Sequence, residues 1–140
     1  MVKAQNYGEK ISDKEIIAQV CLLIPAAIDT TNRLIANTLF CLCSNQDQLI
    51  QVQNNHKLIL NAIEETLRYE PPIHSTVRMA LKDVDLMGVK IPSGSLINVN
   101  FASANRDGKY FQDSEKFDIF RKIHLIFRLE VVDINVWEEL

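Results

Sequence analysis

The sequence has little of what marks several large classes of protein. Its 140 residues include only 4 glycines, 4 prolines and 1 tryptophan, which excludes collagenous and low-complexity chains. Neither charge dominates, because 15 basic and 18 acidic residues leave a formal charge of −3. We therefore expect no nucleic-acid partner. A hydrophobic share of 47% instead indicates a globular chain that is one domain or a piece of one.

Signals for export and for membrane insertion are also lacking. Residues 1–10 contain no apolar segment of a signal peptide, and the longest apolar run, residues 20–28, is far short of the roughly 20 residues of a membrane span. The 3 cysteines, Cys21, Cys41 and Cys43, lie in apolar helical sequence. Their odd number predicts buried, reduced thiols rather than a disulfide framework. We therefore expect a soluble, cytoplasmic protein with no membrane partner.

A helix start at Ser12 is the clearest local signal. Ser12 can cap the first turn, and Glu15 can reach back to complete a capping box. The helical pattern then continues over residues 13–43, about 45 Å at 1.5 Å per residue. Residues 20–28 are apolar on every face of this helix, which is typical of a helix inside a large protein. The remaining predicted elements are too small to cover it, so we infer that partner structure is missing.

Shorter elements follow the long helix. Residues 47–53 and 57–69 predict two helices, and Pro71 and Pro72 end the second because proline cannot continue the hydrogen-bond ladder. Four segments are β-like: 76–81, 84–86, 89–91 and 96–101. The predicted fold class is mainly α with a small β portion.

An acid and an alcohol, Asp29 and Thr30, stand together in the apolar helix, where polar groups must be satisfied locally or serve a purpose. In a local interpretation, the Thr30 hydroxyl donates to the Ala26 carbonyl and Asp29 marks where the helix meets solvent. In a functional interpretation, the pair is a proton relay at a helix distortion, because Pro25 removes one ladder bond in the same turn. The residues alone favour the local interpretation.

Other charged residues have similarly plain explanations when each is taken alone. Glu65 and Arg68 are spaced as an exposed ion pair on one helix face, worth a few tenths of a kcal/mol. Arg78 in an apolar strand and His124 between apolar neighbours are isolated polar groups, which are most often satisfied in a core or at an edge.

The order of the motifs along the chain favours a functional interpretation of these residues over the separate local ones. A Gly-Glu-Lys-Ile-Ser-Asp entry at 8–13 precedes Ala-Ala-Ile-Asp-Thr-Thr at 26–31, Glu-Thr-Leu-Arg at 65–68 and Phe-Asp-Ile-Phe-Arg at 117–121. Together they resemble the carboxy-terminal half of a bacterial, soluble-type cytochrome P450, a heme-thiolate monooxygenase. The second motif is similar to the family's oxygen-activation motif, Ala-Gly-x-acid-Thr-Thr, with Ala27 in place of the glycine. The third is similar to its ExxR element.

The resemblance implies a partial P450 fold over residues 1–127, with a long central helix, two shorter helices and β-hairpin segments. It implies a proton relay at Asp29 and Thr30 and heme-propionate contacts at Arg78 and His124, since guanidinium groups match carboxylates well. The remaining implied residues form a structural triad and a set of substrate contacts: Glu65, Arg68 and Arg121, and Ala26, Ala27, Thr76 and Val77.

The resemblance ends after Phe127, where the family continues as Phe-Gly-x-Gly-x-His-x-Cys and the cysteine thiolate ligates the heme iron. Here Arg128 and Glu130 fall on the glycines and Ile134 falls on the cysteine. Residues 128–140 are therefore a divergent tail, and no metal ligand is predicted in it. The cysteines at 21, 41 and 43 lie on the helix that would face the other side of the heme.

In the intact family, the resemblance implies heme b, electrons from a ferredoxin or flavoprotein redox partner, and insertion of one oxygen atom from O2 into a small organic substrate. For this chain we expect a truncated oxidoreductase fragment that binds no heme and is inactive alone. The alternative is a non-enzymatic helical interaction module derived from the same fold, which would use the uncovered long helix to bind another chain.

Overall fold

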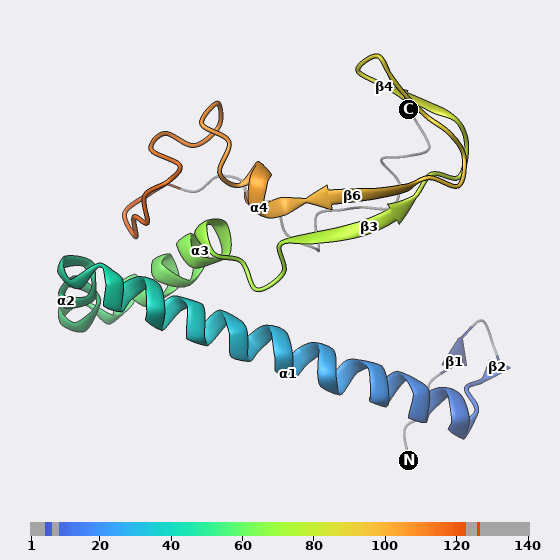
Figure 1. The fold of residues 1–140 in the computed structure, drawn as a ribbon. Coiled ribbons are helices and arrows are strands. Elements are labelled where there is room, and N and C mark those ends of the chain that lie inside the picture. Colours follow the sequence, from blue (N-terminus) through green and yellow to red (C-terminus); the bar gives the residue numbers. More distant parts are fainter. Residues whose placement is uncertain (1–4, 7–8, 123–125, 127–140) are drawn as a thin grey trace.

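The computed structural model describes residues 5–6, 9–122 and 126, and its longest element is one helix, α1 (Asp13–Ser44). In Figure 1, α1 is the long rod, 32 residues in length, that crosses the lower half of the picture. The predicted capping box is present: the Ser12 hydroxyl accepts from the Glu15 N–H at 3.3 Å, and the Glu15 carboxylate accepts from the Ser12 N–H at 2.8 Å. These bonds satisfy N–H groups that no preceding turn can pair, so the helix begins here.

The amino-terminal half of α1 has little structure packed against it. Leu22, Leu23 and Ile24 are 71%, 63% and 53% exposed. Consecutive helical residues point about 100° apart, so these three side chains are distributed around the helix axis. Burial begins only near the carboxyl end, at Cys41 and Leu42. This exposure agrees with the inference that structure around the long helix is missing.

Short helical elements pack across the carboxyl end of α1. They are α2 (Gln46–Asn54), the 3-10 helix η1 (His56–Leu58) and α3 (Ile59–Tyr69). Both predicted helices are confirmed, and the second begins as a 3-10 turn in which the Asn55 side chain accepts from the Lys57 N–H at 3.2 Å. In Figure 1, α2 and α3 gather at the end of α1 that is far from its capped start.

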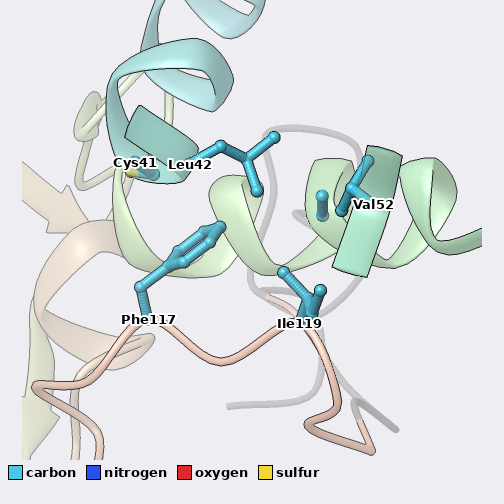
Figure 2. Packing of buried hydrophobic residues seen from close by; sticks show 6 residues of the cluster. Cys41, Leu42, Val52, Phe117 and Ile119 are labelled. Atoms are coloured by element: carbon cyan, nitrogen blue, oxygen red, sulfur yellow. The ribbon is translucent and has the colours of Figure 1, made fainter. Parts of the chain in front are cut away.

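The hydrophobic core joins these helices to a later, irregular segment of the chain. Its members are Cys41, Leu42, Val52, Ala62, Phe117 and Ile119. Figure 2 shows Phe117 and Ile119 projecting from that segment towards the helices. Tyr69 adds an edge-on contact to Phe117, with ring centroids 5.9 Å apart. Each buried large apolar side chain contributes about 1.5–3 kcal/mol, so this cluster holds the segment around residue 117 against the helices.

The β portion consists of two-stranded antiparallel sheets. β3 (Ser75–Met79) pairs with β6 (Leu96–Asn100), and β4 (Val84–Leu86) pairs with β5 (Val89–Ile91), all within two residues of the predicted bounds. Met87 and Gly88 both have positive φ, 52° and 86°, as the tight β4–β5 turn requires. The fold class predicted from the sequence is confirmed.

Some elements were not predicted. β1 (Gln5–Asn6) and β2 (Glu9–Lys10) pair just before α1. The strand predicted to run through Phe101 instead ends at Asn100, because the Asn100 side chain accepts from the Ser103 N–H at 2.9 Å and starts the one-turn helix α4 (Phe101–Ala104).

The expectation of buried thiols is correct for Cys41 and wrong for Cys21 and Cys43, which are exposed on α1. Cys21 lies on the uncovered half of the helix, and Cys43 points away from the core that covers its neighbours. All three are free thiols. Within the described part of the chain, no helix is both long enough and apolar enough to cross a membrane.

Candidate functional site

The predicted α1 pair makes local contacts. The Thr30 hydroxyl donates to the Ala26 carbonyl at 2.8 Å, as the local interpretation expected. The Asp29 carboxylate accepts from Arg33 one turn later at 3.0 Å, in an exposed ion pair. Ala26 and Ala27 are themselves exposed. The pair therefore lies on the uncovered half of α1, with Pro25 in the turn before it.

Glu65 and Arg68 of α3 are not the exposed pair that their spacing alone predicts, because both are 0% exposed. Arg68 donates from Nε to Glu65 Oε2 at 2.9 Å and from Nη2 to Glu65 Oε1 at 2.8 Å, a two-point guanidinium–carboxylate pair. Glu65 Oε1 also accepts from Arg121 Nε at 3.3 Å and from the Asp118 N–H at 2.9 Å. The structure thus brings Glu65, Arg68 and Arg121 into one cluster, which we call the Glu-Arg-Arg cluster.

The two arginines of the Glu-Arg-Arg cluster also hold a long irregular segment by its backbone. Arg68 donates at 2.9 Å to three carbonyls, those of Asn105, Ser114 and Lys116. Arg121 donates to three as well, those of Gln112, Asp113 and Lys116. A buried guanidinium has five N–H donors in a fixed fork, so it can pair both a carboxylate and several carbonyls that no helix or strand would satisfy.

The predicted residues of β3 divide between the two faces of the strand. Arg78 is half-buried and donates to the Thr76 hydroxyl at 3.1 Å and to the Val77 carbonyl at 3.2 Å. Val77 points to the opposite face, where it is 56% exposed, because successive side chains alternate along a strand. Within residues 9–122, no hydrogen bond or ion pair joins this strand to Asp29 or Thr30. His124 and Ile134 lie outside the described residues.

Arg106 is a residue to which the sequence analysis assigned no role. Its guanidinium carbon lies 4.4 Å from the centroid of the Tyr69 ring, and its Nη2 donates to the Tyr69 carbonyl at 2.7 Å. Arg106 lies in the turn after α4 and carried no periodic or spacing signal in the sequence. Its partners are distant in sequence, so only the fold reveals them.

Comparison with known proteins shows what arrangement these elements form. The family model for cytochrome P450 matches residues 1–121. The chain belongs to the cytochrome P450 family. Cytochrome P450 107B1 of Saccharopolyspora erythraea is 42% identical over 123 residues, which are 87% of this chain and 30% of that protein. The biotin biosynthesis cytochrome P450 of Bacillus subtilis is 38% identical over 113 residues, 81% of this chain and 29% of that protein.

Solved P450 structures share the fold over the same stretch. Substrate-free CYP109E1 from Bacillus megaterium superposes with a TM-score of 0.83 at 35% identity, covering 89% of this chain and 32% of that one. P450BioI, solved with a fatty-acyl-ligated acyl carrier protein, gives 0.77 at 38% identity over 82% of this chain and 30% of that one. The chain thus spans about 30% of the length of the relatives it matches. None of these comparisons favours the non-enzymatic module.

The three cysteines of this chain all lie on one helix. P450 iron is held by a cysteine thiolate, whereas Cys21, Cys41 and Cys43 are all on α1, the helix that also carries Asp29 and Thr30. Burial raises the pKa of the Cys41 thiol to about 11, with a further contribution from the Glu70 carboxylate. Cys41 is therefore a protonated core thiol at neutral pH.

Proposed function

We propose that this chain is a carboxy-terminal-half fragment of a P450 monooxygenase, with a partial P450 domain over residues 1–127 and a divergent tail over 128–140. The observation that carries the proposal is the buried Glu-Arg-Arg cluster, set in an arrangement of helices and strands that superposes on solved P450 structures. The family's activity is heme-dependent insertion of one oxygen atom into an organic substrate. Because no cysteine follows α1, we propose that the chain alone binds no heme and has no monooxygenase activity.

The site residues are assigned on the same resemblance. We assign Asp29 and Thr30 to the proton relay of the intact fold, and Arg78 and His124 to the heme propionates. Substrate contacts are proposed at exposed or half-buried positions of α1 and β3: Ala26, Ala27, Thr76 and Val77. The exposure of Ala26 and Ala27 supports this assignment, because residues that line a pocket in the intact protein are left uncovered in a fragment of it.

The substrate class and partners are proposed from the relatives. CYP109E1 was solved with corticosterone and with testosterone, and P450BioI with hexadec-9Z-enoic acid on acyl carrier protein. We propose a small, largely apolar organic substrate and a ferredoxin or flavoprotein electron donor for the intact protein. A cytoplasmic location is supported by the free thiols, which persist in reducing compartments.

A chimera tests the fold assignment directly. Residues 1–121 would replace the matching stretch of cytochrome P450 107B1, which keeps its own cysteine loop. We expect the reduced, CO-treated chimera to absorb near about 450 nm, the signature of thiolate-ligated heme. The matched controls are the same chimera with Glu65→Gln, which should lose the band, and with Arg33→Gln, which should keep it. A folded chimera without the band would refute the assignment.

Heme titration of the purified chain tests the second half of the proposal. We expect no saturable binding and no band near about 450 nm after reduction and CO. A variant with all three cysteines replaced by alanine should behave identically. A band in the chain that disappears in this variant would show that a thiolate of α1 reaches the iron, and the fragment would then be an enzyme candidate.

A further inference from the structure

We propose that Arg106 is a positioning residue that fixes the start of β3 against α3, and thereby sets where Thr76 and Arg78 lie. The roles of Thr76 and Arg78 rest on the proposed function; the placement of β3 by Arg106 does not. Nothing in the sequence motifs or the family match assigns a role to this arginine.

All three guanidinium nitrogens of Arg106 donate hydrogen bonds. Nη2 donates to the Tyr69 carbonyl at 2.7 Å and Nε donates to the same oxygen at 3.2 Å. Nη2 also donates to Glu70 Oε2 at 3.2 Å, and Nη1 donates to Glu115 Oε2 at 3.1 Å. The guanidinium stacks near the Tyr69 ring as well. The Tyr69 carbonyl belongs to the last turn of α3, where carbonyls lack helical partners and a cation is favourable.

Arg106 and Arg68 each donate to the backbone carbonyl of a residue adjacent to the other arginine. Arg68 donates to the carbonyl of Asn105, the residue before Arg106, at 2.9 Å. Arg106 donates in return to the carbonyl of Tyr69, the residue after Arg68. The Tyr69 ring also lies 5.7 Å from the Arg68 guanidinium carbon. The end of α3 and the turn after α4 are therefore joined at two points, one of which is fully buried in the Glu-Arg-Arg cluster.

The link from this joint to β3 is short and stiff. The Glu70 carbonyl accepts from the Asn37 side chain of α1 at 2.9 Å, while the Glu70 carboxylate is held by Arg106. Pro71 and Pro72 follow, and each has its φ fixed by the ring. Just before β3, the His74 carbonyl accepts from Ala102 at 3.1 Å. The orientation of the backbone at Glu70 therefore constrains where β3 lies, because few backbone torsions between them are free to rotate.

Hydrogen exchange of the full 140-residue chain tests this role without heme. In Arg106→Gln, we expect the amides of β3 to exchange at least about tenfold faster, while those of Ala62 and Thr66 in α3 stay within about threefold. The reason is that the variant loses the charged hydrogen bonds that hold Tyr69 and Glu70, the residues from which the chain leads into β3. Arg106→Lys should not rescue the effect, since an ammonium cannot form the fork or the stack. Glu115→Gln, which removes only the exposed carboxylate partner, should leave β3 exchange near that of the unsubstituted chain.

Several results would overturn the proposal. They are unchanged β3 exchange in Arg106→Gln, an equal acceleration in α3 and β3, full rescue by lysine, or no protection of either element in the unsubstituted chain. If Arg106→Gln does not fold, Asn37→Ala removes the hydrogen bond from α1 to the Glu70 carbonyl and should accelerate β3 exchange selectively by a smaller factor. Uniform or absent acceleration in that variant would also overturn the proposal. A positive heme titration would contradict the proposed function and would leave these exchange readouts unaffected, so the two proposals fail separately.

Discussion

Glu65→Gln is expected to cost more stability than a change to any exposed ion pair of this chain. Glu65 accepts from Arg68 twice, from Arg121 and from the Asp118 N–H, all in a fully buried position. Glutamine keeps the shape but places an NH2 group against an Arg68 donor and removes the negative charge. The Arg68 guanidinium then stays buried without a carboxylate.

The magnitude follows from that burial. Removing one partner of a buried ion pair costs about 3–5 kcal/mol, because the remaining charge is left uncompensated. Arg68 keeps its three carbonyl partners in the variant, so we expect the lower end, about 3 kcal/mol. With a denaturant slope of about 1–3 kcal/mol per molar in urea, the unfolding midpoint should fall by about 1–3 M.

Urea unfolding followed by far-UV circular dichroism measures this shift, with the slope compared between variants. Arg33→Gln is the matched control, because it breaks the exposed Asp29–Arg33 pair and should cost no more than about 0.5 kcal/mol. A loss below about 1 kcal/mol for Glu65→Gln, or one equal to that of Arg33→Gln, would refute the view that the Glu-Arg-Arg cluster holds this fold.

Further outcomes follow from other parts of the chain. Iodoacetamide should label Cys21 and Cys43 in the native chain and Cys41 only after unfolding, and rapid labelling of all three would contradict the observed core. The pKa of Cys41 rises from its ordinary 9.0 to about 11, so the stability that the protonated thiol contributes is fully present below pH 9 and is lost as the pH rises towards 11, by roughly 3 kcal/mol. The urea midpoint should therefore fall between pH 9 and pH 11, and this pH dependence should be absent in Cys41→Ala. Leu23→Gln should reduce self-association in sedimentation velocity without lowering the urea midpoint. A loss of more than about 1 kcal/mol of unfolding free energy would show that this side chain is covered after all. Ser12→Ala should open the first turn of α1 in hydrogen exchange, at a cost of about 1 kcal/mol, and unchanged exchange there would show that the capping box is not needed.

Local sequence signals were enough for most of the secondary structure. The Ser12–Glu15 capping box and the two prolines at 71 and 72 act within one turn of the chain, so the start of α1 and the end of α3 follow from them. The two-residue strands β1 and β2 are too short for any periodicity to show. The helix α4 was missed because both Asn100, its cap, and Phe101, its first residue, were assigned to the strand predicted over 96–101.

The candidate site was predicted unevenly. The spacing of Glu65 and Arg68 showed that they could pair, and resemblance to the P450 motifs suggested Arg121 as the third member. Spacing could not show that the pair is buried, because burial depends on the segment around Phe117 that covers it. Arg106 could not be found at all, since its partners at Tyr69 and Glu70 are 36 or 37 residues away along the chain.

What the sequence determined by itself is the family and the longer helices and strands, because capping, periodicity and ordered motifs are properties of neighbouring residues. It also determined that the long helix is apolar on every face over residues 20–28 and that none of residues 45–140 is a cysteine. Only the tertiary structure decided which charges are buried, which thiol is protonated in the core, and which arginines hold the irregular segment and the end of α3. Those outcomes depend on contacts between residues far apart in the chain, where desolvation and directed hydrogen bonds decide the energy and local pattern carries no information about them.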